Sequence, residues 1–192
     1  TTPRPAWRLI KALNGGGILV NWGCYDLDYL LGITGWTLKP ETVFAQTWTV
    51  PSSFESHVAP GSDAETYYLA TVRCQGGIIL SMERGEFMTA QSESDWQVIG
   101  SKGSLKLKMT DSNPQSIIHD STTTEKGVIS KPFWNPEDNS TTTHVGGPLV
   151  DFATAIREER QPLTSLEQSL VVQEITDAIY TSAAQGAAVE VN

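Results

Sequence analysis

The fold of this chain turns on residues 15–28, which read GGGILVNWGCYDLD. Three successive glycines cost too much backbone entropy for a helix interior, so they indicate a point where the backbone turns sharply or approaches another group closely. The apolar run that follows predicts a helix over residues 18–33. The apolar side of this helix is formed by Leu19, Leu27, Leu30 and Leu31. Gly35, just beyond the helix, can end it.

Three polar side chains interrupt this apolar helix at helical spacing. Asn21, Tyr25 and Asp28 lie at i, i+4 and i+7, and at about 100° per residue they fall within one narrow stripe. An amide, a phenol and a carboxylate therefore point the same way. Because buried polar groups must be hydrogen-bonded, the three groups either bond a neighbouring loop or face a ligand. The spacing leaves both interpretations open.

Beyond this helix the hydrophobic period changes to two. Strands are predicted at residues 43–50, at 67–74 and 78–83 around a Gly-Gly turn, and at 96–99 and 105–109 around a GSKG turn. Residues 110–146 are rich in Thr, Ser, Asn and Pro. They predict a long excursion with two short strands, near 115–119 and 127–130.

The C-terminal part is helical. Pro148 suits a helix start, and this helix is expected to run to about residue 159. The sequence SLEQ at 165–168 is a capping box for a further helix that Gly186 ends, with a last strand at 189–191. The chain is therefore expected to have an α+β fold: an open, mostly antiparallel β-sheet with helices packed on one face.

The other face of such a sheet is either polar or covered by a partner. Trp48, Tyr67, Tyr68 and Trp96 are aromatic residues of the predicted strands, and their apolar area favours a partner. We expect this sheet face to form a homo-oligomer.

Composition narrows the classes of function. The 192 residues fit one domain spanning 1–192, and 13 Lys+Arg against 22 Asp+Glu give a net charge of −9. A chain this acidic is not expected to bind nucleic acid or an anionic membrane. No apolar run reaches the roughly 18 residues of a membrane span, and no signal peptide is visible. The two cysteines lie in apolar patterns, so a cytoplasmic location is expected. The histidines are scattered, so no metal site is predicted.

The glycine-rich helix resembles the signature GGGxLx(D)xGx(H)xxD, which opens the C-terminal domain of the Gfo/Idh/MocA oxidoreductases. The resemblance continues in VIGSKGSL at 98–105, which is similar to a GTKGSL hairpin of that family. Residues 148–163 and 170–191 resemble its two closing helices and last strand. The resemblance covers nearly the whole chain.

This resemblance implies the substrate-binding and oligomerisation domain of a two-domain enzyme. In that family an N-terminal Rossmann domain binds NAD or NADP, and hydride passes between the nicotinamide and a sugar, a polyol or an inositol-like alcohol. The Rossmann fingerprint GxGxxG does not occur here, and the chain opens at Thr1 without Met, so we expect a piece of a longer protein. The fragment alone is expected neither to hold the cofactor nor to be active.

Two positions depart from the family pattern. Asn21 stands where the family has Asp, and Tyr25 stands where it usually has His. Tyr also occurs at this place in some relatives similar to glucose–fructose oxidoreductase, where a phenol can act as the proton donor. The resemblance therefore implies that Tyr25 relays the proton while Asn21 orients a hydroxyl. Asp28 matches the family position; a structural role is expected for it, and it is kept as a substrate-binding candidate. Trp7 and Arg8 either reach a substrate edge or serve as a packing anchor and a solvated cation.

Two other functions stay open. With Asn21 and Tyr25 in place of the Asp/His pair, the fold would also suit a non-catalytic ligand-binding or assembly module. The second alternative is NAD-dependent glycoside hydrolysis, which some relatives of the family perform by transient oxidation. The expected partners are a carbohydrate-like small molecule, the chain's own N-terminal Rossmann domain and a second copy of the chain.

Overall fold

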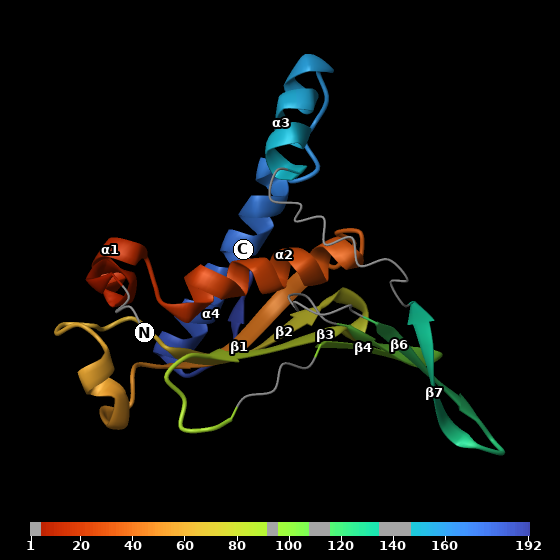
Figure 1. Cartoon of the computed structure of the whole chain (residues 1–192), viewed down its shortest axis with the longest axis horizontal. Coiled ribbons are helices and arrows are strands. Elements are labelled where there is room, and N and C mark those ends of the chain that lie inside the picture. The colour runs from red at the N-terminus through yellow and green to blue at the C-terminus, as the bar shows by residue number, and fades with distance from the viewer. Residues whose placement is uncertain (1–4, 92–95, 108–115, 135–146) are drawn as a thin grey trace. The chain divides into compact units, whose positions relative to one another are not determined.

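The computed structural model of the chain describes residues 5–91, 96–107, 116–134 and 147–192 (Figure 1). Contacts divide the chain into two compact units, residues 1–89 with 148–192, and residues 90–147. Both units contain antiparallel sheets, and the helices that the structure describes belong to the first, so the predicted α+β fold class is confirmed. Within the described residues the strands form two four-stranded sheets, where the sequence indicated one.

The first unit begins with short helical turns and the glycine-rich segment. The predicted helix over 18–33 is confirmed in extent, but its first turn is a π-helix rather than an α-helix. Gly15, with φ of 79°, ends the preceding helix in the left-handed conformation that glycine adopts easily. The elements in this part are η1 (Ala6–Leu9), α1 (Lys11–Asn14), η2 (Leu19–Gly23) and α2 (Cys24–Ile33).

The sheet of the first unit has the strand order β3-β2-β1-β8, and every pairing is antiparallel. Its strands are β1 (Pro40–Trp48), β2 (Tyr67–Cys74), β3 (Ile79–Gly85) and β8 (Val189–Glu190). Two 3₁₀ turns accompany them, η3 (Ser52–His57) and η4 (Gln75–Gly77). Strand β2 has the predicted bounds, and Gly76 and Gly77 both have positive φ in the predicted Gly-Gly turn.

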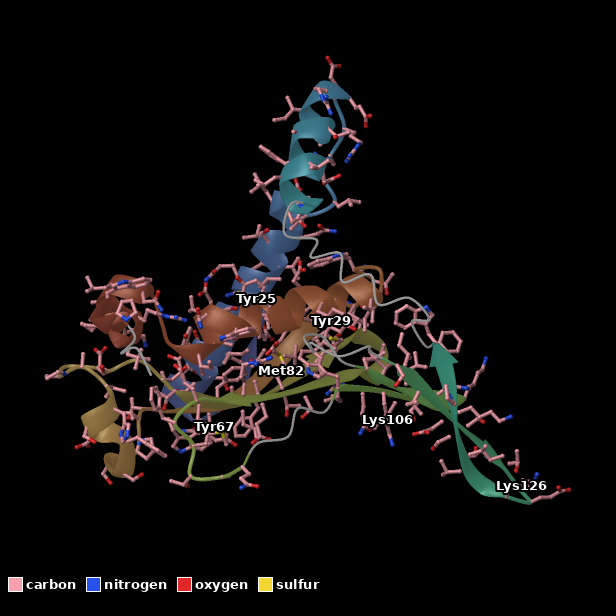
Figure 2. The ribbon with its side chains drawn as sticks, in the orientation of Figure 1. Tyr25, Tyr29, Tyr67, Met82, Lys106 and Lys126 are labelled. Carbon is pink, nitrogen blue, oxygen red and sulfur yellow. The ribbon has the colours of Figure 1, made fainter. Side chains whose placement is uncertain are left out.

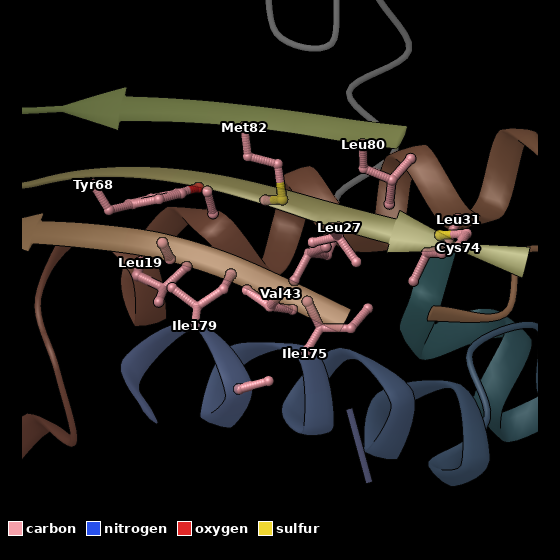
Figure 3. Close-up of a cluster of buried hydrophobic side chains, with 14 of the residues drawn as sticks. Leu19, Leu27, Leu31, Val43, Tyr68, Cys74, Leu80, Met82, Ile175 and Ile179 are labelled. Carbon is pink, nitrogen blue, oxygen red and sulfur yellow. The ribbon is translucent and has the colours of Figure 1, made fainter. Parts of the chain in front are cut away.

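One face of this sheet is buried under α2 and α4 (Leu166–Gln185) (Figure 3). The strands alternate between buried and exposed residues, because successive side chains point to opposite faces. The core combines apolar residues of the sheet, of α2 and of α4: Val43, Tyr68, Val72, Leu80, Met82, Leu27, Leu31, Ile175 and Ile179.

The prediction of aromatic side chains on the open face was half wrong. Trp48 and Tyr67 do lie there, with their rings stacked 4.9 Å apart between centroids. Tyr68 is fully buried in the core instead, because a period of two puts the neighbours Tyr67 and Tyr68 on opposite faces. Trp96 lies in the other sheet.

The closing helices of the first unit begin close to the predicted positions. Helix α3 (Gly147–Arg157) ends two residues before the predicted boundary. Helix α4 has the predicted capping box, in which the Ser165 side chain accepts from Gln168 N and the Gln168 side chain accepts from Ser165 N. Gly186 ends α4 in the left-handed conformation, with φ of 63°.

The second unit is an antiparallel sheet with the strand order β4-β5-β6-β7. Its strands are β4 (Trp96–Gly100), β5 (Gly103–Leu107), β6 (Ile117–Thr123) and β7 (Gly127–Trp134). The two short strands predicted in the polar excursion are therefore longer than expected and pair as a hairpin. Met109, the predicted end of β5, and Gln115, the predicted start of the next strand, lie outside the described residues.

Candidate functional site

A buried carboxylate holds the start of the glycine-rich helix. Glu65 Oε1 accepts hydrogen bonds from Gly17 N at 2.8 Å, from Leu19 N at 3.1 Å and from the Tyr180 hydroxyl at 2.8 Å. The Glu65 backbone carbonyl accepts a fourth bond, from Ile18 N at 3.0 Å. The first backbone N–H groups of a helix have no partner within the helix, and a negative charge suits them. Glu65 therefore fixes where this helix begins.

The same contact explains two of the three glycines. A Cβ on Gly17 would overlap the backbone carbonyl of Glu65, and a Cβ on Gly16 would overlap the Tyr180 hydroxyl. The sequence expectation of a close approach is thus confirmed, and its partners are Glu65 and Tyr180. Burial and the charge of Glu65 raise the pKa of the Tyr180 phenol far above its usual value, so this phenol stays a hydrogen-bond donor.

The polar stripe crosses a change of helix type. Asn21 lies in the π-helical turn and is half-buried, whereas Tyr25 and Asp28 lie in α2. Within α2, Tyr25 and Asp28 are three residues apart and share a side of the helix. An angle of 100° per residue does not apply across a π-turn, so the spacing places Tyr25 with Asp28 but does not place Asn21 with them.

Tyr25 and Asp28 both lie on the outward side of α2 (Figure 2 labels Tyr25). The Tyr25 side chain is 60% exposed, the largest exposure among the aromatic residues of the described first unit. Asp28 is also exposed, yet partial removal from water raises the pKa of its carboxyl. A phenol and a carboxyl are thus available side by side on an accessible helix face, which suits contact with hydroxyl groups.

On the inward side of the same helix lies an ion pair that the sequence analysis missed. Arg84 Nε and Nη2 each donate to a carboxylate oxygen of Asp26 at 2.6 Å, and Asp26 is 5% exposed. The hydrogen bond with Asp26 raises the pKa of Arg84. A signal did exist: Leu80, Met82 and Arg84 share the buried face of β3, so an arginine there requires an anionic partner.

Two aromatic rings extend from this ion pair toward the outward side. The Arg84 guanidinium carbon lies 5.2 Å from the centroid of the Trp22 ring, and the Trp22 and Tyr25 ring centroids are 5.8 Å apart. Tyr68 lies on the inward side; burial, and then the charge of Asp26, raise the pKa of its phenol well above the usual value. Tyr68 therefore stays neutral, and of these two phenols Tyr25 is the one that solvent can reach.

Trp7 and Arg8 lie in η1, before the glycines. Trp7 is 50% exposed and Arg8 is half-buried. Asn14 Nδ2 donates to the backbone carbonyls of Arg8 at 3.1 Å and Gly16 at 2.8 Å, which ties η1 to the glycine-rich segment. Within the described part of the chain, no hydrogen bond or ring contact joins Trp7 or Arg8 to the polar stripe, so their link to the site stays a prediction.

Within the described ranges, no group of three or more His, Cys, Asp or Glu residues is placed to hold a metal ion. A membrane crossing needs a long apolar helix, and none occurs among the described residues.

The fold and the glycine-rich helix define the chain as an oxidoreductase domain. Residues 1–191 match the family model described as "Oxidoreductase family, C-terminal alpha/beta domain". The chain belongs to the Gfo/Idh/MocA family of oxidoreductases. No curated protein sequence matches it.

Solved structures share this fold at low sequence identity. An aldose-aldose oxidoreductase from Caulobacter crescentus complexed with glycerol has 21% identity and a TM-score of 0.76, with 99% of this chain and 52% of that chain covered. An oxidoreductase domain protein from Kribbella flavida has 20% identity and a TM-score of 0.75, with coverage of 98% and 55%. Levoglucosan dehydrogenase in complex with NADH and L-sorbose has 18% identity and a TM-score of 0.75, with coverage of 100% and 54%. This chain spans about half the length of these relatives.

Proposed function

We propose that this chain is the substrate-binding and oligomerisation domain of a longer NAD(P)-dependent oxidoreductase, which oxidises a sugar, polyol or inositol-like alcohol by hydride transfer. The observation that carries the proposal is Tyr25, an accessible phenol at the signature position of a helix whose other side is fixed in the core. The carbohydrate and NADH named for the levoglucosan dehydrogenase structure support this class of substrate and cofactor.

The dinucleotide is assigned to another domain. Its phosphates need a glycine-rich strand–helix turn, and GxGxxG does not occur in the 192 residues. A nicotinamide cofactor held by that domain would supply the hydride acceptor for the carbinol carbon of the alcohol. The residues of this chain act on the other side of that carbon, where the hydroxyl must lose its proton.

In this role the Tyr25 phenol releases its own proton to solvent, which its 60% exposure allows, and takes up the hydroxyl proton of the substrate. Asn21 offers an amide that donates to and accepts from a hydroxyl but carries no charge. Asp28, on the same side as Tyr25, accepts hydrogen bonds from further hydroxyl groups of the substrate. The alcohol loses a hydride from carbon to the nicotinamide and a proton from oxygen to Tyr25, and a carbonyl remains.

An apolar stripe on α3 supports a second domain. Leu149, Phe152 and Ile156 are exposed at i, i+3 and i+7 of α3, and Leu163 and, in α4, Leu166 and Leu170 are exposed too. Asp151 holds the turn beneath the stripe, since it accepts from Leu163 N at 2.7 Å and from Arg160 Nη2 at 2.7 Å. Exposed apolar patches of this kind mark interaction sites. We assign this stripe to the N-terminal Rossmann domain.

The open face of the first sheet supports self-association. Phe44, Trp48, Leu69 and Ile79 are exposed on it. A twofold axis would pack this face against itself, since such an interface uses the same patch on both copies. Cys24 and Cys74 are both free thiols, which supports a reducing compartment such as the cytoplasm.

The test starts with the intact polypeptide that carries this sequence, purified from its native source and weighed. It is then incubated with NAD⁺ or NADP⁺ and a panel of aldoses, polyols and inositols, while NAD(P)H absorbance is followed. The proposal expects a mass near twice 20.9 kDa and steady NAD(P)H formation with at least one member of the panel. A mass near 20.9 kDa, or binding of panel members without NAD(P)H formation, would instead favour the non-catalytic module that Asn21 allows.

A further inference from the structure

A buried ion pair lies directly beneath the proposed proton-transfer residue. Asp26 follows Tyr25 in the chain and is 5% exposed, and it receives two hydrogen bonds of 2.6 Å from Arg84 of β3. Burying such a pair removes two charges from water, and an apolar pair of similar volume is often at least as stable. The pair is therefore weak evidence for stability, and its geometry needs another account.

That geometry fixes more than two side chains. The Arg84 guanidinium also lies over the Trp22 ring, 5.2 Å from its centroid, and the Trp22 ring packs against the Tyr25 ring at 5.8 Å with an interplanar angle of 60°. Trp22 belongs to the π-turn and Tyr25 to the first turn of α2. One guanidinium of the sheet thus contacts the helix on both sides of the change from π to α geometry, where functional sites often occur.

We propose that Arg84 is a positioning residue for Tyr25, acting through Trp22, with Asp26 holding the guanidinium in place. The proposal rests on the proposed role of Tyr25 in proton transfer. Asp26 sets the guanidinium plane, the guanidinium sets the Trp22 ring, and the Trp22 ring limits the orientations open to the exposed Tyr25 ring. A phenol held in this way meets a substrate hydroxyl without first being ordered, which favours the reaction step over binding.

The shape of arginine matters in this arrangement, and so Arg84→Lys is the informative change. Lysine keeps the positive charge beside Asp26, so the buried carboxylate stays paired. It lacks the planar fork, so it cannot donate to both carboxylate oxygens in parallel while covering the Trp22 ring. The matched control is Arg73→Lys, because Arg73 is an exposed arginine of the neighbouring strand whose contact with Glu41 is 3.9 Å long.

The first measurement is the NMR spectrum of the 192-residue chain, read for nuclear Overhauser effects between the Trp22 and Tyr25 rings and for the ring-current shift of the Tyr25 protons. Arg84→Lys is expected to weaken both signals by at least half, whereas Arg73→Lys leaves them unchanged. Should Arg84→Lys destabilise the fold, the double variant D26N/R84Q pairs two neutral amides and leaves no buried charge. The same two NMR signals are then measured on that variant, with the same expected loss. Unchanged Trp22–Tyr25 signals in well-folded Arg84→Lys or in D26N/R84Q would overturn the proposal.

The second measurement uses the longer, active protein. Arg84→Lys is expected to lower kcat about tenfold while KM stays within twofold, since substrate contacts are kept and orientation is lost. A rise in KM with kcat unchanged would contradict the positioning role. If Tyr25→Phe leaves turnover unchanged, the proposed function fails, and the spectroscopic result still decides whether Arg84 orients Tyr25.

Discussion

The two sides of the helical segment 18–33 differ in what determines their residues. On the inward side, Leu19, Leu27 and Leu31 are fully buried against the sheet and α4. On the outward side, Tyr25 and Asp28 are exposed and are not required by packing. Residues of the first kind are determined by packing in the core, and residues of the second kind are those for which we propose a role in function. Substitutions on the two sides should therefore have separate effects, on stability and on activity.

The largest effect is expected at the buried start of the segment. Gly17→Ala places a Cβ into the backbone carbonyl of Glu65, which cannot move without shifting the chain before β2. We expect the free energy of unfolding to fall by about 3 kcal/mol or more, as measured by urea denaturation of the 192-residue chain. The control is Gly32→Ala on exposed α2, where no atom lies closer than 4.0 Å and helix propensity predicts a gain of about 0.5–1 kcal/mol. Equal stability of the two variants would refute the close-contact account.

A somewhat smaller loss is expected at the carboxylate that receives this segment. Glu65→Ala leaves Gly17 N, Leu19 N and the Tyr180 hydroxyl without their acceptor. Buried donors without a partner cost about 1–3 kcal/mol, so we expect a loss of about 2–3 kcal/mol. Tyr180→Phe removes one of the three bonds and should cost about 1 kcal/mol in the same denaturation experiment. A Glu65→Ala loss no larger than that of Tyr180→Phe would show that the two backbone bonds contribute nothing.

The open face of the first sheet offers a test that leaves the buried side untouched. Leu69→Lys puts a charge on the exposed face of β2, where Leu69 lies between Gln46 and Glu83 of the neighbouring strands. If two copies pack through this face, their dissociation constant should rise at least tenfold in sedimentation velocity. Ile33→Lys, at an exposed position on α2, is the control and should leave association unchanged. A wild-type chain that is purely monomeric at high micromolar concentration would remove the oligomer proposal.

The smallest effect concerns pH and the exposed carboxyl of the stripe. Because partial desolvation raises the pKa of Asp28, the folded chain holds this proton more tightly than the unfolded chain, whose Asp pKa is about 3.9. Stability therefore falls as pH rises from that value through the folded pKa. Asp28→Asn should remove this decline and raise stability at pH 7 by at most a few tenths of a kcal/mol.

Asp151 is expected to change stability with pH in the opposite direction, and it serves as the control for this experiment. The Leu163 N–H and Arg160 hold the pKa of Asp151 below its usual range. The stabilisation that ionised Asp151 gives to the fold is present above the pKa of the unfolded chain, and it is lost as pH falls through the pKa of the folded chain. Asp151→Asn should therefore flatten the acid end of the stability curve. If stability depended on pH in the same way in Asp28→Asn and Asp151→Asn, the opposite pKa shifts assigned to these two carboxyls would be contradicted.

How far the sequence predicts this structure depends on how local each signal is. The capping box at Ser165, the strand 67–74 and the helix over 18–33 are local patterns, and all three are confirmed. Trp96 was assigned to the wrong sheet because strand pairing joins residues far apart in the chain. The π-turn was missed because hydrophobic spacing does not separate it from an α-helical turn.

The site shows the same limit. The signature positions Asn21, Tyr25 and Asp28 stood out by their spacing, but the residues that hold the segment did not. Glu65 acts across 48 positions on Gly17, and Arg84 acts across 58 positions on Asp26. In each case one partner gave a clue of its own, the glycine triplet in the first and a charged residue on a buried strand face in the second. The pairing itself required the fold.

The most direct test of the account is Tyr25→Phe, measured for both stability and turnover, with Tyr67→Phe on the opposite face of the sheet as the control. Removing an exposed hydroxyl should change the free energy of unfolding by no more than about 0.5 kcal/mol. If Tyr25 relays the hydroxyl proton, NAD(P)-dependent oxidation by the proposed longer protein should fall by about 10²-fold or more, with Tyr67→Phe near wild type. Turnover of Tyr25→Phe within twofold of wild type would contradict the claim that the outward side of this helix carries the chemistry.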